Sequence, residues 1–182
     1  MQPRHNHRPN SDRIHGTMPP PVYLSLGSNL GDREAQLREA IARLNHIGRV
    51  LQVSSLYETE PVEFADQPWF LNLAVELETS NTPARAISAI LQIEQDMGRR
   101  HLQHKGPRGI DIDILLFGDH IIDSPQLTIP HPAMQERRFV LEPLAEIAPD
   151  LQHPLLKKTI QELRDELPPG QEVKRITPRE GH

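Results

Sequence analysis

Hydrophobic and polar residues follow one another along the first two thirds of the chain in patterns typical of strands and helices. Strands are predicted where apolar residues run together or alternate with polar ones, over residues 22–27, 50–56, 70–77 and 110–117. Helices are predicted where apolar residues recur every three or four positions, between Asp32 and Gly48 and between Thr82 and Gly98. The order of elements is therefore βαββαβ.

This order predicts an α+β fold with a ferredoxin-like core, in which helices pack on a mainly antiparallel sheet. Two short helices are expected further along, over residues 140–148 and 159–167. The length of 182 residues suits a single domain, which we place over residues 22–167. The Pro-rich residues 1–21 are predicted to be a disordered N-terminal tail, and residues 168–182 a flexible C-terminal tail.

The fourth predicted strand carries two aspartates, Asp111 and Asp113, among isoleucines. Side chains alternate between the faces of a strand, so both carboxylates point the same way with Cβ atoms roughly 6.5–7 Å apart. Carboxylates at that spacing can share a pair of metal ions, and such ligands suit Mg²⁺ better than zinc. The alternative is a half-buried strand with a solvated outer face. Aspartate is a poor strand former, however, which makes two in one strand unexpected.

A basic segment directly precedes this strand. Within ten residues it holds Arg99, Arg100, His101, His104, Lys105 and Arg108, and no acidic residue. Cationic side chains beside a metal pair would hold a polyphosphate and neutralise charge that develops during phosphoryl transfer. A solvated charged loop is the alternative. The sequence has no G-x-x-x-x-G-K-[ST] motif, which excludes a P-loop.

Composition narrows the possible classes of protein. The net charge of −5 disfavours a globally basic nucleic-acid binder. The absence of cysteine excludes disulfides, thiolate zinc sites and a cysteine nucleophile, and it fits a reducing cytoplasm. No stretch approaches the ~18 consecutive apolar residues of a membrane span. We therefore expect a cytoplasmic protein that binds small molecules and neither nucleic acid nor a membrane. We also expect a monomer.

A series of motifs in a fixed order resembles those of one enzyme family. They are Leu26-Gly27-Ser28-Asn29-Leu30-Gly31, Tyr57-Glu58-Thr59-Glu60-Pro61, Phe70-Leu71-Asn72, Gly106-Pro107-Arg108-Gly109-Ile110-Asp111-Ile112-Asp113-Ile114-Leu115, Pro130-His131-Pro132-Ala133-Met134 and Arg137-Arg138-Phe139-Val140-Leu141-Glu142-Pro143-Leu144. Together they span roughly residues 22–150 and are similar to the 6-hydroxymethyl-7,8-dihydropterin pyrophosphokinases. The resemblance implies Mg-dependent transfer of the diphosphate of ATP to the pterin hydroxymethyl group, with release of AMP, in tetrahydrofolate biosynthesis.

The resemblance also implies roles for particular residues. It implies that two Mg²⁺ ions bind Asp111 and Asp113, and that catalysis involves Arg99, Arg108, Asp111, Asp113 and Arg137. The residues that it implies for ATP are Glu94, Arg99, Arg108, Ile114, Thr128, His131 and Arg137. Those for the pterin are Thr59, Pro61, Val62, Phe70, Asn72 and Phe139, with Phe70 and Phe139 stacking on the ring and Asn72 reading its edge.

The sequence departs from the family pattern in the basic segment. Lys105 stands where many relatives have an aromatic residue, and His101 where many have a second arginine. We expect residues 57–69 and 99–110 to be loops that close on substrate. Two other readings remain open: a metal-dependent nuclease or nucleotidyltransferase, and a non-catalytic ferredoxin-like interaction module that would tolerate Asp111→Asn and Asp113→Asn.

Overall fold

A computed structural model describes residues 19–61, 66–98 and 109–176 of the chain. Its centre is a six-stranded sheet in which every pairing is antiparallel. The strands are β1 (Pro21–Ser28), β2 (Arg49–Val53), β3 (Leu56–Thr59), β4 (Phe70–Glu78), β5 (Asp111–Phe117) and β8 (Val173–Ile176). Their order is β5-β1-β4-β3-β8, and β2 pairs with the other end of β4.

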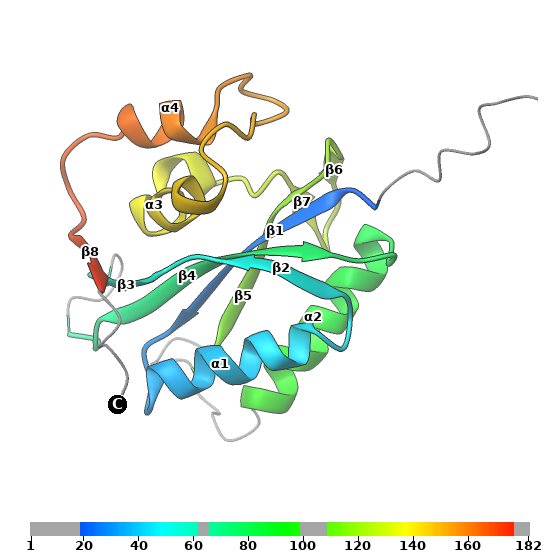
Figure 1. Cartoon of the computed structure of the whole chain (residues 1–182), viewed down its shortest axis with the longest axis horizontal. Coiled ribbons are helices and arrows are strands. Elements are labelled where there is room, and N and C mark those ends of the chain that lie inside the picture. The colour runs from blue at the N-terminus through cyan, green and yellow to red at the C-terminus, as the bar shows by residue number, and fades with distance from the viewer. Residues whose placement is uncertain (1–18, 62–65, 99–108, 177–182) are drawn as a thin grey trace, which may run out of the picture.

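Helices cover both faces of this sheet (Figure 1). On one face lie α1 (Arg33–Leu44) and α2 (Pro83–Gly98), and on the other lie α3 (Arg138–Ile147) and α4 (Ile160–Asp165). A two-stranded ribbon of β6 (Ile122–Asp123) and β7 (Thr128–Ile129) and the short 3-10 helix η2 (Met134–Glu136) connect β5 to α3. The α+β class and the mainly antiparallel sheet are as the sequence predicted.

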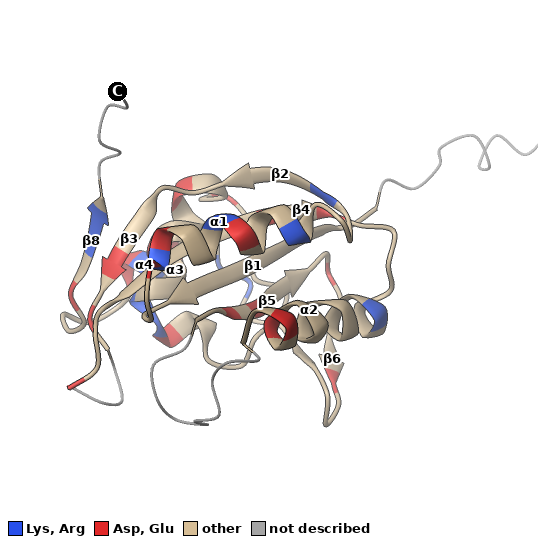
Figure 2. Ribbon diagram, turned by 90° about the horizontal axis from the view of Figure 1, so that it is seen from below, with Lys and Arg blue, Asp and Glu red and all other residues tan. Residues whose placement is uncertain are grey.

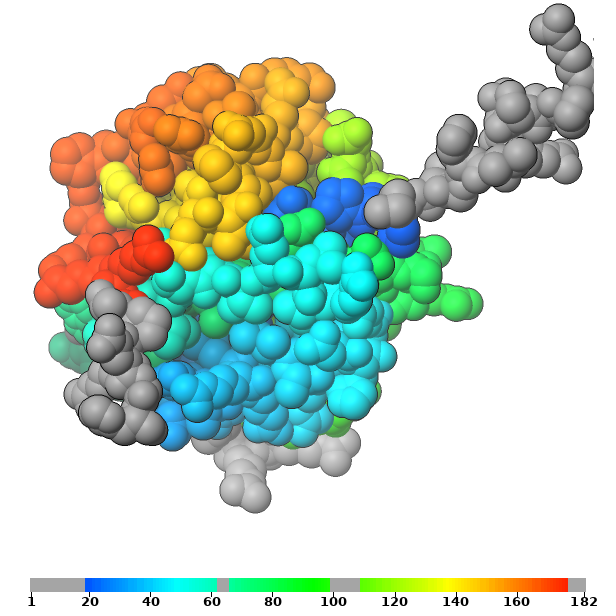
Figure 3. All heavy atoms as spheres, in the orientation of Figure 1, coloured from blue at the N-terminus to red at the C-terminus, as the bar shows by residue number. Residues whose placement is uncertain are grey.

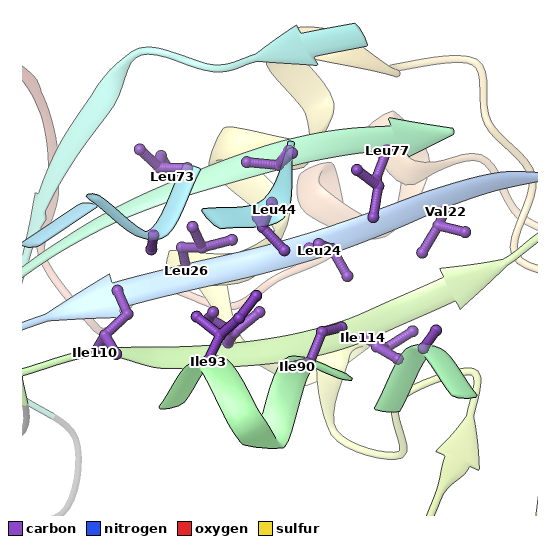
Figure 4. Close-up of a cluster of buried hydrophobic side chains, with 14 of the residues drawn as sticks. Val22, Leu24, Leu26, Leu44, Leu73, Leu77, Ile90, Ile93, Ile110 and Ile114 are labelled. Atoms are coloured by element: carbon purple, nitrogen blue, oxygen red, sulfur yellow. The ribbon is translucent and has the colours of Figure 1, made fainter. Parts of the chain in front are cut away.

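The larger hydrophobic core lies between the sheet and the helices α1 and α2 (Figure 4). Leu24 and Leu26 of β1 enter it, as do Ile112 and Ile114 of β5, because alternate residues of a strand share a face. From α2, Ile90 packs against them. The packing of this core therefore fixes the position of β5, the strand that bears the two aspartates.

A second core lies on the opposite face, under α3 and α4. A register shift between β1 and β5 leaves an extra residue at Leu115, so that both Leu115 and Leu116 face this side. They pack with Leu141 and Leu144 of α3. The second core covers only one end of this face, and the aspartates lie beyond it.

The exposed side of α1 carries charged residues of both signs (Figure 2). Asp32 caps the helix by accepting a hydrogen bond from the Ala35 N–H at 3.0 Å. Arg43 pairs with Glu39 one turn earlier at 2.9 Å, an exposed contact that contributes only about 0.3–0.5 kcal/mol. The packing of α1 therefore depends on its apolar face, which buries Leu37, Ala40 and Leu44.

The structure has two strands, β2 and β3, where a single strand was predicted over residues 50–56. The loop predicted over residues 57–69 begins inside β3. The interruption is at Ser54, whose backbone N–H donates to the Ala74 oxygen at 2.9 Å. Its hydroxyl accepts from the Ala74 N–H at 2.9 Å. A side-chain hydroxyl thus takes a place in the ladder that a carbonyl normally fills, and the strand bends there.

The prediction of a flexible C-terminal tail is wrong for residues 173–176. These residues form β8 at the edge of the sheet, beside β3. The strand packs next to α3, as the space-filling view shows (Figure 3). Residues 177–182 lie outside the described residues, as do residues 1–18 of the predicted N-terminal tail. In the described part of the chain, no helix is both long and apolar enough to cross a membrane.

Candidate active site

Asp111 and Asp113 lie on one face of β5, as the alternation predicted. Asp111 pairs with Gly27 of β1, and Asp113 pairs with Ser25. Both aspartates are half-buried, whereas Ile112 between them is 3% exposed and belongs to the larger core. The apolar side of β5 therefore fixes the strand while both carboxylates point to the face that carries α3.

A row of paired residues crosses the sheet at this level. Asp111 pairs with Gly27, Gly27 with Asn72 of β4, and Asn72 with Tyr57 of β3. Residues that pair across antiparallel strands point to the same face, and neighbouring strands are roughly 4.8 Å apart. Because Gly27 has no side chain, the Asn72 side chain can lie close to the backbone between Asn72 and Asp111. The carboxylate and the amide therefore lie at the same level of the sheet, one strand apart.

The Asn72 side chain is held in one orientation. Its Nδ2 donates a hydrogen bond to the Thr59 hydroxyl, and both side chains are buried. Its Oδ1 faces Gly27, so closely that a Cβ added to Gly27 would collide with it. Phe70, two residues earlier on β4, lies beside this point, with Cδ1 3.6 Å from the same Cβ position. Three of the residues predicted to contact the pterin, Thr59, Phe70 and Asn72, are therefore neighbours.

His131 faces the same region from the segment after β7. Its Nδ1 accepts a hydrogen bond from the Ala133 N–H at 3.2 Å, so the neutral ring carries its proton on Nε2. Burial lowers the pKa of His131, the nearby Asp113 carboxylate opposes this shift, and the Arg137 cation adds to it. The imidazole is thus a neutral N–H donor beside one aspartate and one arginine.

Arg137 and Phe139 lie together at the start of α3. The guanidinium carbon of Arg137 is 5.6 Å from the centroid of the Phe139 ring, which is within the range of a cation–π contact. Phe139 is half-buried and packs against the second core. The start of α3 therefore offers a cation and an aromatic ring over the sheet face that carries the aspartates.

The other residues predicted to bind ATP lie along the outer edge of β5. Glu94 of α2 accepts a hydrogen bond from the Ile112 N–H at 3.2 Å, which ties the helix to the strand between the two aspartates. The Ile114 side chain is 4% exposed and packs in the larger core, so only its backbone could meet a nucleotide. Thr128 is half-buried on β7.

Some predicted residues fall outside the described part of the chain. These are Arg99, Arg108 and Val62, together with Lys105 and most of the segment expected to close on substrate. Pro61 is described and half-buried. Within residues 19–61, 66–98 and 109–176, no three His, Asp or Glu side chains gather closely enough to hold a metal ion. Asp111 and Asp113 would therefore share any metal with ligands from water or substrate.

Gly27 is a site residue that the sequence analysis did not assign. It lies inside β1, within the strand predicted over residues 22–27. The signal was present, because a glycine inside a strand often marks a close approach of another group. Which group approaches became visible only from the register of β1, β4 and β5.

Comparisons with known proteins identify the family of this chain. A family model described as 7,8-dihydro-6-hydroxymethylpterin-pyrophosphokinase matches residues 23–149. The 2-amino-4-hydroxy-6-hydroxymethyldihydropteridine pyrophosphokinase of Bacillus subtilis is 51% identical over 128 residues, which cover 69% of this chain and 77% of that protein. The corresponding Aquifex aeolicus protein is 39% identical over 145 residues, covering 80% of this chain and 91% of that protein.

Other similar proteins are much longer. The folic acid synthesis protein fol1 of Schizosaccharomyces pombe is 49% identical over 149 residues, but these are only 20% of that protein and 81% of this chain. Among solved structures, wild-type Plasmodium falciparum HPPK-DHPS with STZ-DHP matches with a TM-score of 0.65 at 20% identity, over 80% of this chain and 43% of that chain. At this identity the likeness supports the fold alone.

Proposed function

Because this chain belongs to the 7,8-dihydro-6-hydroxymethylpterin-pyrophosphokinase family, we propose that it transfers the diphosphate group of ATP to the hydroxymethyl group of 6-hydroxymethyl-7,8-dihydropterin. The products are AMP and the pterin diphosphate, an intermediate of tetrahydrofolate biosynthesis. The observation that carries the proposal is the row of paired residues Asp111, Gly27 and Asn72. This row supports the proposal because its carboxylate suits a phosphate-bound metal and its amide suits the polar edge of a flat heterocycle.

The pterin binds beside Gly27, with the Asn72 amide at its polar edge. Asn72 Nδ2 already donates to Thr59, so its Oδ1 is the atom available to accept a hydrogen bond from the ring. Phe70 and Phe139 provide flat apolar surfaces for stacking. The family resemblance also implies contacts from Pro61 and from Val62, which lies outside the described residues.

ATP lies along β5 and the segment that follows β7. Glu94, the backbone of Ile114 and Thr128 contact the nucleoside end, while His131 and Arg137 contact the phosphates. The neutral His131 donates from Nε2 to a phosphate oxygen, and Arg137 donates from its planar fork. Arg99 and Arg108 add positive charge, as expected from the family resemblance.

The donor set suits magnesium. Asp111 and Asp113 lie on the same face of β5, and Mg²⁺ commonly keeps several waters while binding one or two carboxylates and substrate phosphates. We infer that both aspartates hold two Mg²⁺ ions with the triphosphate. When bound, such ions neutralise the charge on the phosphate oxygens.

The reaction forms one bond and breaks one bond. The hydroxymethyl oxygen of the pterin bonds to the β-phosphorus of ATP, and the bond from that phosphorus to the bridging oxygen of the α-phosphate breaks. The bridging oxygen leaves with AMP, and the hydroxyl proton passes to solvent. The residues of this chain contribute by orienting the two substrates and by donating hydrogen bonds to phosphate oxygens from His131 and Arg137.

Incubation of the protein with Mg-ATP and 6-hydroxymethyl-7,8-dihydropterin tests the proposal. We expect AMP and the pterin diphosphate, separated and quantified by liquid chromatography, and no turnover after chelation of divalent cations. Formation of ADP would indicate an ordinary kinase, and the absence of any turnover would contradict the proposal. A cytoplasmic location and a monomeric state stay predictions of the sequence.

A further inference from the structure

The carboxylate of Glu146, near the end of α3, joins the helix to the sheet through four contacts. Oε2 accepts from the Ser55 N–H at 2.8 Å and from the Ser55 hydroxyl at 3.2 Å. Oε1 accepts from the Tyr57 hydroxyl at 2.7 Å and lies 3.6 Å from Arg175 Nε of β8. We call Glu146, Ser55, Tyr57 and Arg175 the Glu146 network. None of them was among the predicted site residues.

The Glu146 network is charged in the folded protein. Burial raises the pKa of Glu146, but the hydrogen bonds from Tyr57 and Ser55 and the charge of Arg175 outweigh it, so the pKa lies below its ordinary value. Burial and the Glu146 carboxylate also raise the pKa of Tyr57, which keeps its hydroxyl a donor. Hydrogen bonds to a charged acceptor are stronger and more directional than neutral ones.

The network shares its two elements with the proposed pterin site. Phe139 and Glu146 are seven residues apart on α3, and seven residues make nearly two full turns, so both project from the same side of the helix. On the sheet, Tyr57 pairs with Asn72 and lies two residues from Thr59, on the same face. One side of α3 thus carries both Glu146 of the network and Phe139 of the pterin site. In the same way, β3 carries both Tyr57 of the network and Thr59 of the pterin site.

Apolar packing alone would not fix the distance between these two groups. The remaining contacts of α3 with the sheet are made by Leu141, Leu144 and other apolar residues of the second core. Hydrophobic contact is non-directional, so a helix held only in this way can slide or tilt by small amounts. Four directional contacts to one carboxylate remove that freedom. A stacked ring needs a gap of fixed width, and a displacement of 1 Å in such a site can cost about 100-fold in rate.

We propose that Glu146 is a positioning residue for the pterin: through Tyr57 and Ser55 it sets the gap between Phe139 on α3 and the Thr59–Asn72 pair on the sheet. The inference rests on the proposed function, because it takes the pterin as the occupant of that gap. Glu146 does not touch the substrate itself. Its effect is larger on the affinity for the pterin than on the affinity for ATP, because Arg137 is the one proposed ATP contact at the start of α3 and the others lie along β5 and after β7.

Two variants of the full-length chain test this proposal. Glu146→Gln keeps the shape of the side chain but removes its charge. Tyr57→Phe removes the hydroxyl and keeps the aromatic ring. We expect each to raise the KM for the pterin about tenfold at saturating Mg-ATP, with a much smaller change in the KM for ATP. In the double variant the two effects should add to less than their sum, because Tyr57 and Glu146 contact each other. Glu142→Gln is the matched control, since Glu142 lies one turn earlier and pairs with Arg138 at 3.2 Å.

The results separate this inference from the proposed function. Formation of AMP by the wild-type protein tests the function alone. An unchanged KM for the pterin in both variants would contradict the positioning role and leave the function standing. Equal rises in the KM values for the pterin and for ATP, in step with a lower melting temperature, would also contradict it, because they indicate general destabilisation. Quenching of pterin fluorescence gives the same comparison without turnover.

Discussion

The amide oxygen of Asn72 occupies the space into which any side chain on Gly27 would project. Gly27→Ala should therefore push the Asn72 amide out of place and raise the KM for the pterin more than that for ATP. Inserting a methyl group into a close-packed site usually costs about 1–3 kcal/mol. Steady-state kinetics with each substrate varied in turn measure the effect.

Gly170→Ala is the matched control for Gly27→Ala. A Cβ at Gly170 meets no atom within 4 Å, and its φ is not in the left-handed region. This variant should have wild-type kinetics and a wild-type melting temperature. If Gly27→Ala behaved in the same way, the position of the Asn72 amide over Gly27 would have no role in binding.

Asp111→Asn and Asp113→Asn should each lower kcat by at least about 100-fold, because an amide cannot replace a carboxylate as a ligand of phosphate-bound metal. Both aspartates are half-buried and lie outside the larger core, so the melting temperature should stay near that of the wild type. Asp123→Asn on the exposed ribbon is the control. Full activity in both β5 variants would contradict the role of the two aspartates as ligands of a catalytic metal.

Buried His153 should make the fold sensitive to acid. Its side chain is 3% exposed, and Nδ1 accepts the N–H groups of Leu155 at 3.2 Å and Leu156 at 3.1 Å. Burial lowers the pKa of His153 below the value near 6.5 that it has in the unfolded chain. The unfolded state therefore binds more protons, so this contribution to stability is complete above about pH 6.5 and is lost as the pH falls through the folded pKa.

Thermal unfolding between pH 8 and pH 5 measures this effect. His153→Asn keeps an oxygen acceptor near the position of Nδ1 but removes the titrating group, so its melting temperature should fall less steeply with acid than that of the wild type. His120 on the surface turn after β5 is a control position, and His120→Asn should leave the slope as it is. Equal slopes in all three proteins would assign the acid sensitivity to other groups.

Removal of residues 173–182 should lower the stability by a few kcal/mol. It deletes β8, exposes the edge of β3 and takes Arg175 away from Glu146. Each lost hydrogen bond contributes about 0.5–1.5 kcal/mol. Denaturant unfolding of a chain ending at Glu172 measures the loss, and a chain ending at Ile176 is the control. Equal midpoints for the two chains would mean that β8 adds nothing to stability.

The parts of the fold that the sequence predicted are those with strong local patterns. The alternation of Asp111 and Asp113 with isoleucines was enough to place both carboxylates on one face of a strand. The helix from Pro83 to Gly98 was likewise clear from its proline start and apolar stripe. In both cases the residues that decide the structure are neighbours along the chain.

The parts that the sequence missed depend on contacts between distant residues. β8 is stable only because β3 pairs with it, and the bend at Ser54 needs Ala74 as its partner. The contact of Glu146 with Tyr57 joins residues 89 positions apart. Neither residue has a local pattern that distinguishes it from an ordinary helix glutamate or strand tyrosine. The pairing of strands across the sheet made these contacts visible.

The alternation along β5 also has a consequence for how such an enzyme can adapt. Ile112 and Ile114 belong to a core that never meets the substrate, whereas Asp111 and Asp113 belong to a surface that contributes little to that core. Changes on the apolar side can tune heat tolerance, and changes on the acidic side can tune chemistry. One short strand thus lets a lineage alter thermostability and reactivity independently.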